Sequence, residues 1–294
     1  MKQFQGIYPA LLTPFTADNQ INETVLRQLV RWNLKKQVTG FYVGGSTAEA
    51  FLLSADERKR LLEIVADECA GRAVVIAHVG AISTDVAENL ARHAAANGAD
   101  AISSIPPFYY KFTMEEIKRY YFDLADAVDL PVLVYHFPAF SGVSFTPDDA
   151  DEFLSDSRFM GIKYTASDFY MLERIKQQHP DKVVFNGFDE MFMAGLAMGA
   201  DGGIGSTYNF MAEKFIAIRR YMQNGEIKAA QAIQQEVNQV IQTLLKVGIF
   251  AGEKEILCQL GFDFGICRRP FQPLNDAGKQ EIAAIMPLFE AWNR

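Results

Sequence analysis

The chain has 294 residues, of which 49% are hydrophobic and 22% are charged, a composition typical of soluble globular proteins. Its formal net charge is −8 and it contains no basic cluster, so we expect no nucleic-acid partner, because nucleic-acid-binding proteins gather Lys and Arg on one face. The apolar stretch at residues 7–14 is too short and too interrupted by proline for a signal peptide or a membrane helix. We therefore expect a cytoplasmic protein with no membrane segment.

Short apolar runs alternate with longer segments of helical period from the N-terminus to about residue 222. The pattern predicts eight strands, at residues 6–12, 40–43, 73–77, 101–105, 131–135, 159–163, 182–185 and 203–204. Helix starts between them are marked by capping boxes, in which Ser54 precedes Glu57 and Thr113 precedes Glu116, and by Pro147 at a first helical position.

Eight βα units in a segment of this length favour a (β/α)8 TIM barrel, an α/β fold. An open doubly wound sheet is the alternative, but no glycine-rich dinucleotide turn follows the first strand. We predict a catalytic barrel over residues 1–222 and a C-terminal helical extension over residues 223–294 that packs on it as one structural unit. Its helices are predicted at residues 227–247, 253–259 and 276–292.

Polar residues follow most of the predicted strands, and the carboxyl ends of the strands are where barrels of this kind hold their active sites. These candidates are Ser46 and Thr47, Tyr109, Tyr135, Lys163 and Thr165, Gly187, Asp189 and Glu190, and Ser206.

Lys163 ends an apolar run, where a merely solvated lysine is not expected. A neutral lysine amine forms an iminium with a carbonyl substrate, and burial would lower its pKa from the usual 10.4 or so. Tyr135 ends the neighbouring strand, about 4.8 Å away, and is a candidate proton carrier, or alternatively a core tyrosine. Ser46 and Thr47 are candidate carboxylate binders, or alternatively helix caps.

Asp189 and Glu190 are either acids favoured by a helix dipole or acceptors for substrate hydroxyls. No metal is expected, because the four histidines show no ligand spacing; structural roles are the default for at least three of them, and the role of His136, next to Tyr135, is left open. The four histidines are His78, His93, His136 and His179. The three cysteines also lack metal-ligand or disulfide patterns and are expected to be reduced thiols: Cys69, Cys258 and Cys267.

Four motifs, at residues 6–15, 44–49, 161–163 and 202–206, resemble those of the class I pyruvate aldolases that include N-acetylneuraminate lyase and dihydrodipicolinate synthase. The resemblance covers essentially the whole chain. It implies a (β/α)8 barrel with C-terminal helices, usually a homotetramer, in which Lys163 forms a Schiff base with pyruvate and no cofactor is needed. It also implies that Tyr135 transfers protons and that Tyr109 reaches into the site of a neighbouring subunit.

The details are most similar to members that cleave sialic acid. In that case Ser46 and Thr47 bind the substrate carboxylate, and the sugar portion contacts Thr165, Gly187, Asp189, Glu190 and Ser206. Dihydrodipicolinate synthases typically place an Arg just after Pro138, whereas this chain has Ala139 and Phe140. A substrate with a second carboxylate would therefore lack its counter-ion.

The resemblance thus implies aldol cleavage of N-acetylneuraminate, a sialic acid, to N-acetylmannosamine and pyruvate. One alternative is another pyruvate-dependent aldolase, acting on a 2-keto-3-deoxy sugar acid. Another is a relative without catalytic activity that binds a keto acid.

Overall fold

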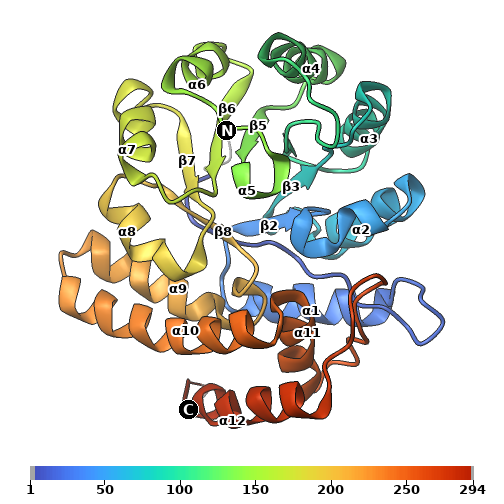
Figure 1. Cartoon of the computed structure of the whole chain (residues 1–294), viewed down its shortest axis with the longest axis vertical. Coiled ribbons are helices and arrows are strands. Elements are labelled where there is room, and N and C mark those ends of the chain that lie inside the picture. Colours follow the sequence, from blue (N-terminus) through green and yellow to red (C-terminus); the bar gives the residue numbers. More distant parts are fainter. Residues whose placement is uncertain (1–3, 293–294) are drawn as a thin grey trace.

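The computed structural model describes residues 4–292, with the side chains of residues 4–289. Its eight strands are all parallel, in the order β1-β8-β7-β6-β5-β4-β3-β2. A bridge between Ala10 and Tyr42 brings the two ends of the sheet together, so the sheet forms a barrel (Figure 1). The strands are β1 (Ile7–Pro9), β2 (Gly40–Val43), β3 (Val74–His78), β4 (Ala101–Ser104), β5 (Val132–His136), β6 (Phe159–Tyr164), β7 (Val183–Asn186) and β8 (Gly202–Gly205). The predicted TIM barrel is confirmed.

The first strand is shorter than the predicted residues 6–12. After Pro9 the chain leaves the regular ladder, and the Leu12 amide donates to the side chain of Asn209 at 3.2 Å instead of to a strand. The other strands differ from prediction by one residue at one or both ends, apart from β2, which matches.

Helices follow the strands and surround the barrel. The barrel helices are α1 (Glu23–Lys35), α2 (Ala55–Cys69), α3 (Thr84–Ala96), α4 (Met114–Ala127), α5 (Pro138–Ser141), α6 (Pro147–Leu154), α7 (Phe169–Gln178), α8 (Phe192–Ala197) and α9 (Tyr208–Gln223), with short 3-10 turns η1 (Ser46–Ala48), η2 (Ala50–Leu52) and η3 (Asp189–Met191). The capping boxes predicted at Ser54 and Thr113 are both formed. Their paired hydrogen bonds satisfy amides that the first turn leaves free.

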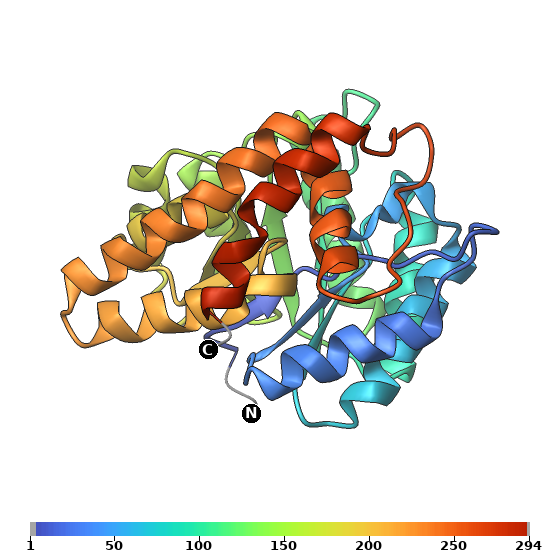
Figure 2. The ribbon, with the colours of Figure 1, turned by 90° about the horizontal axis from the view of Figure 1, so that it is seen from below.

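Three further helices, α10 (Ile227–Val247), α11 (Ile249–Gln259) and α12 (Asp276–Trp292), lie together along one side of the barrel (Figures 1 and 2). α10 packs along α9, and α12 packs on α10 and α11. The prediction that the second helix starts at residue 253 is wrong: α11 starts at Ile249, because Gly248, with φ 103°, turns the chain directly from one helix into the next. The division of the chain at residue 222 stays a prediction.

Side chains alternate between the inside and the outside of the barrel, and one irregularity in β6 changes that alternation. In β5, Leu133 and Tyr135 belong to the cluster that fills the barrel, whereas Val132 and Val134 pack under the helices. In β6, Met160 packs inside the barrel and Ile162 outside it, with one extra residue between the pairs Val132–Phe159 and Leu133–Gly161. This extra residue is a β-bulge.

Gly161 makes the bulge possible. Its φ is 157°, and a Cβ at this position would lie 1.9 Å from the carbonyl oxygen of Val183 on the neighbouring strand. Only glycine fits such a close backbone approach. After the bulge Lys163 pairs with Tyr135, and both side chains face the inside of the barrel.

In residues 4–292 no helix is long and apolar enough to cross a membrane. Among the described residues the three cysteines form no disulfide.

Candidate active site

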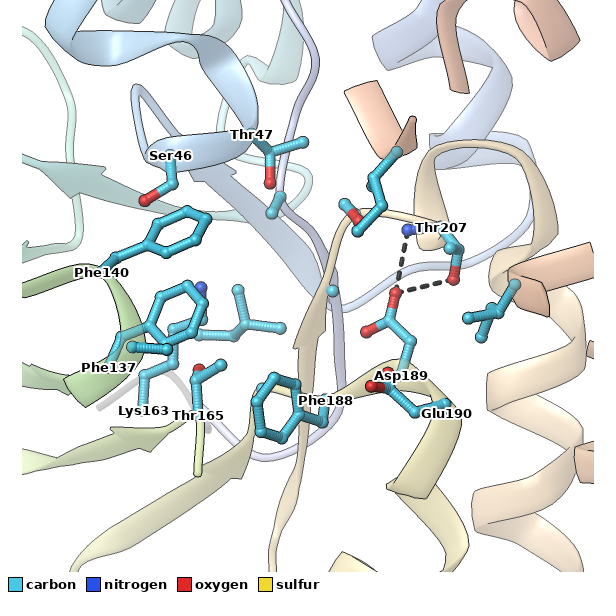
Figure 3. Close-up of a pocket in the computed structure, with 18 of the residues that line it drawn as sticks. Ser46, Thr47, Phe137, Phe140, Lys163, Thr165, Phe188, Asp189, Glu190 and Thr207 are labelled. Atoms are coloured by element: carbon cyan, nitrogen blue, oxygen red, sulfur yellow. Dashed lines mark hydrogen bonds between the residues drawn. The ribbon is translucent and has the colours of Figure 1, made fainter. Parts of the chain in front are cut away.

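A cavity of about 350 Å³ opens at the carboxyl ends of the strands (Figure 3). Nine of the ten candidate residues line it: Ser46, Thr47, Tyr135, Lys163, Thr165, Gly187, Asp189, Glu190 and Ser206. The barrel geometry therefore brings together residues that are up to 160 positions apart, from Ser46 to Ser206.

Tyr109 is the candidate that does not line this cavity. It lies in the loop after β4 with φ 81°, its side chain is 82% exposed, and its ring packs edge-on against Tyr110 at 5.1 Å. Within one chain Tyr109 therefore makes no part of the cavity.

Lys163 is the central charged group of the cavity, and its side chain is only 5% exposed. Its Nζ lies 3.9 Å from the centre of the Tyr135 ring and 4.5 Å from that of Tyr42. Burial lowers the pKa of Lys163 to about 7, although the carboxyl of Asp189 acts in the opposite direction. A large fraction of the amine is therefore neutral near pH 7, which is the state that attacks a carbonyl carbon.

The Tyr135 hydroxyl lies among other hydroxyls. Burial raises the pKa of Tyr135 well above its usual value, and the nearby hydroxyls of Ser46 and Thr165 offset part of that rise. In the part of the chain that the structure describes, Ser46 Oγ and Thr165 Oγ1 are buried without a partner at regular hydrogen-bond geometry. They are thus open to a polar ligand.

Ser46 and Thr47 begin η1 directly after β2 and Gly44-Gly45. The alternative reading of these two residues as helix caps is wrong, because Gly45 is the N-cap of η1 and Ser54 caps α2. Their side chains reach the cavity from the side opposite Asp189 (Figure 3).

Asp189 forms the other end of the cavity, and its position depends on the neighbouring strand end. One carboxylate oxygen accepts hydrogen bonds from the Thr207 amide at 2.9 Å and the Thr207 hydroxyl at 2.7 Å (Figure 3). A Cβ on residue Gly205 would lie 1.9 Å from the other oxygen, so glycine is needed there for the carboxyl to fit. That second oxygen, Oδ1, is buried without a partner among residues 4–292.

Burial raises the pKa of Asp189 to about 7, while the Thr207 hydrogen bonds favour the ionised form. Glu190 follows in the same turn, lines the cavity, and is half-buried. The backbone carbonyls of both acids are held by α10, through the amide groups of Gln234 at 3.1 Å and Asn238 at 3.1 Å. These bonds fix the turn that presents both carboxyl groups.

An aromatic wall covers the lysine side of the cavity, and the sequence reasoning missed it as a functional feature. Phe137 and Phe140 stack with ring centres 4.3 Å apart, and Phe188 meets Phe137 edge-on at 6.1 Å. Phe140, the residue after Ala139, thus gives the cavity an apolar face in place of a cation that could pair with a second substrate carboxylate. Aromatic residues of this kind look like core residues in a sequence, so their role in the cavity had no separate signal.

The C-terminal helices close the remaining wall, which was also missed. α10 contributes Ile241, Leu244 and Leu245, and α11 contributes Ile249 and Phe250. Ile249 and Phe250 fall in the turn of α11 that the sequence analysis left out.

The histidines have structural partners. His78 Nδ1 lies 2.9 Å from the Gly44 carbonyl oxygen, and its Nε2 accepts from the Ile105 amide at 3.2 Å, so the ring is neutral and holds the loop after β2. His93 pairs with Glu63 at 2.9 Å and His179 with Asp151 at 3.0 Å. His136 faces away from the cavity, stacks on Tyr164 at 5.0 Å, and has its pKa lowered to about 4 by burial.

Known proteins are similar in sequence to this chain over nearly its whole length. Residues 3–288 match the model of the Dihydrodipicolinate synthetase family. The N-acetylneuraminate lyase of Rhizobium meliloti is 45% identical over 290 residues, covering 99% of this chain and 97% of that protein. The N-acetylneuraminate lyase of Citrobacter koseri is 43% identical over 286 residues, covering 97% of this chain and 96% of that protein.

Solved structures are also similar over nearly the whole chain. A Clostridium difficile protein in complex with mannosamine superimposes with a TM-score of 0.95 at 39% identity, over 98% of this chain and 99% of that one. N-acetylneuraminate lyase from Fusobacterium nucleatum complexed with pyruvate superimposes with a TM-score of 0.92 at 36% identity, over 97% of both chains. The chain therefore belongs to the dihydrodipicolinate synthetase family.

Proposed function

We propose that this protein is a Schiff-base aldol lyase that cleaves N-acetylneuraminate to N-acetylmannosamine and pyruvate. The observation that carries the proposal is the buried Lys163 amine, with its pKa lowered to about 7, in a cavity with hydroxyls at one end and acids at the other. Curated relatives at 43–45% identity over nearly the whole chain have the same activity in their names.

The carboxylate end holds the keto acid. Ser46 and Thr47 bind the C1 carboxylate of the open-chain substrate, since their hydroxyls donate hydrogen bonds and Ser46 Oγ has no other partner at regular geometry in residues 4–292. The neutral Lys163 amine attacks C2, water leaves, and an iminium forms. The iminium itself withdraws electrons, so we propose no cofactor for this step.

Tyr135 moves the proton. The C4 hydroxyl loses its proton as the C3–C4 bond breaks, the bond electrons pass to the iminium to give an enamine, and N-acetylmannosamine departs as an aldehyde. Because the raised pKa keeps Tyr135 a neutral phenol, we propose that it relays the proton toward C3 rather than acting as a preformed phenolate. Hydrolysis of the resulting iminium releases pyruvate and free Lys163.

The acid end holds the polyhydroxylated portion of the substrate. Asp189 Oδ1 is a buried acceptor without a partner in the described residues, and Glu190, Thr165 and Ser206 line the wall around it. Burial of an acceptor is costly unless it gains a hydrogen bond, so substrate hydroxyls are its natural partners.

A chemical trap tests the proposal. Incubation with pyruvate and borohydride should add the mass of a reduced pyruvate adduct at Lys163 and at no other lysine, with Lys214, a lysine outside the cavity, as the internal control. The absence of an adduct at Lys163 would remove the enzymatic reading and favour a non-catalytic keto-acid-binding protein. Cleavage rates for N-acetylneuraminate and 2-keto-3-deoxygluconate then identify the substrate; a preference for the shorter acid would point to the other aldolase activity.

We also propose that the protein works as a homotetramer in which Tyr109 reaches the cavity of a second copy. Tyr109 is 82% exposed, and a large, mostly apolar side chain in that position gains from burial by a partner. This exposure supports the role. Size-exclusion chromatography with light scattering should give four chains for the wild type and fewer for Tyr109→Glu. The cytoplasmic location stays a prediction.

A further inference from the structure

Glu253 is a buried acid that the proposed mechanism does not use. It lies on α11 with 0% of its surface exposed, and neither carboxyl oxygen has a partner at regular hydrogen-bond geometry in residues 4–292. A buried carboxyl without full pairing costs free energy of folding, so its presence needs an explanation.

The position of Glu253 connects it to the cavity. Ile249 and Phe250 on the same helix line the cavity, and Glu253 follows them by one turn, on the same helix face. From there it approaches the Ser206 hydroxyl and the Asp189 carboxyl, which are both part of the cavity wall.

We propose that Glu253 is a positioning residue that acts through the Ser206 hydroxyl and determines how the acid end of the cavity binds the substrate polyol. This inference rests on the proposed function and extends it from the cavity wall to the layer behind it.

The proton on Glu253 sets the direction of the Ser206 hydroxyl. A protonated Glu253 donates to Ser206 Oγ, which leaves the Ser206 hydrogen free to point into the cavity and donate to a substrate oxygen. An ionised Glu253 instead accepts the Ser206 hydrogen, so Ser206 presents only lone pairs to the substrate. The protonated form therefore gives one donor, Ser206, beside one acceptor, Asp189 Oδ1, a pattern suited to a pair of hydroxyl groups.

The surroundings of Glu253 keep its proton near neutral pH. Burial raises the pKa of Glu253 to about 8; the Ser206 hydroxyl lowers it and the Asp189 carboxyl raises it further. Among the described residues the Cys267 thiol also interacts with it, and burial raises the pKa of that thiol to about 12, so the thiol stays neutral. Lys254, the next residue of α11, is turned away and pairs with Glu49 at 2.6 Å.

Steady-state kinetics on the full-length chain between pH 6 and pH 9.5 test the proposal with three variants. Glu253→Gln keeps a donor at the same place without titrating, and Glu253→Leu removes it. Glu255→Gln is a matched control two residues further along the same helix, where the carboxyl accepts a hydrogen bond from the nearby Gln259. Borohydride trapping with pyruvate in each variant checks that the Lys163 end is intact.

The wild-type KM for N-acetylneuraminate should rise about tenfold as pH increases through about 8, the effect of one lost hydrogen bond. Glu253→Gln should keep a low KM across this range, Glu253→Leu should show the raised KM at every pH, and Glu255→Gln should behave as the wild type. Pyruvate trapping should be equal in all four proteins.

A Glu253→Gln protein that keeps the alkaline rise in KM would assign the rise to another group, such as Asp189, and would overturn the inference. An unchanged KM in Glu253→Leu would overturn it as well. A wild type that does not cleave N-acetylneuraminate would overturn the proposed function itself, whereas a wild type that cleaves it with a pH-independent KM would overturn only the role of Glu253.

Discussion

At the two ends of the cavity, burial shifts the pKa values of basic and acidic groups in opposite directions. At the amine end, burial under the Tyr42 and Tyr135 rings lowers the pKa of Lys163 and favours a neutral nucleophile. At the acid end, burial raises the pKa of Glu253 to about 8, which favours a retained proton, and raises that of Asp189 to about 7, which reduces its average charge near neutral pH. Desolvation thus reduces the charge at both ends, and the acid end presents hydrogen-bonding groups to the uncharged, polyhydroxylated portion of the substrate.

The largest expected effect is at the amine end. Lys163→Met removes the nucleophile and should reduce kcat for cleavage by about 10⁴-fold or more, because no other group can form the iminium. The rate of pyruvate release checks this, with Lys214→Met as a control that changes a lysine outside the cavity. Substantial activity in Lys163→Met would show that the two ends do not divide the chemistry as proposed.

Tyr135→Phe should lower kcat by about 10²- to 10⁴-fold while leaving the borohydride-trapped adduct intact, since proton transfer is lost but the amine remains. Tyr164→Phe is the matched control, because its hydroxyl donates to the Asp168 carbonyl at 2.8 Å outside the cavity. Loss of the adduct in Tyr135→Phe would mean that the phenol acts already in Schiff-base formation.

At the acid end, Asp189→Asn should raise the KM for N-acetylneuraminate about tenfold and leave pyruvate trapping unchanged. The amide is close in shape to the carboxyl but replaces one acceptor oxygen by a donor. If Asp189→Asn changed pyruvate trapping as much as KM, the acid end would not act separately from the amine end.

Stability should also respond to pH in opposite directions at the two ends. Between pH 7 and its ordinary pKa of 10.5, Lys163 binds more protons in the unfolded chain, so the cost of burying it is largest below pH 7 and fades as pH rises. The Tm of Lys163→Met should exceed that of the wild type by at least about 2–4 °C at pH 6, the shift expected for 1 kcal/mol, and by less at pH 9. Thermal unfolding followed by circular dichroism measures the difference; an excess that grows with pH would contradict it.

The acid end gives the opposite trend. Glu253 has its pKa raised from 4.5 to about 8, so its folded state holds the extra proton; the resulting stability is present below pH 4.5 and is lost as pH rises through about 8. The Tm of Glu253→Gln relative to the wild type should therefore increase from pH 5 to pH 8.5. A constant difference over that range would indicate that Glu253 does not titrate in it.

The sequence predicted the barrel and the positions around its mouth, because strand periodicity and the topology of a βα series place the residues after each strand at one end. It could not predict that Phe137 and Phe140 line a cavity, since an aromatic residue carries the same pattern in a core as in a wall. Glu253 was also missed as a functional residue. Its acid side chain on an amphipathic helix looks solvent-exposed until the packing of α11 on the barrel is known.

The bulge in β6 determines which of the side chains that follow it point into the barrel. Outward and inward positions alternate with a period of two along a strand, so the extra residue, Met160 just before Gly161, decides whether odd-numbered or even-numbered residues beyond it face the barrel. If β6 kept all of its residues but ran as a regular strand from Phe159, the chain would retain Lys163, Tyr135 and every other reacting group, yet the amine would turn outward beneath the surrounding helices. Among relatives, a change that removes the bulge without deleting a residue is therefore a sharper sign of lost catalysis than many substitutions in the cavity itself.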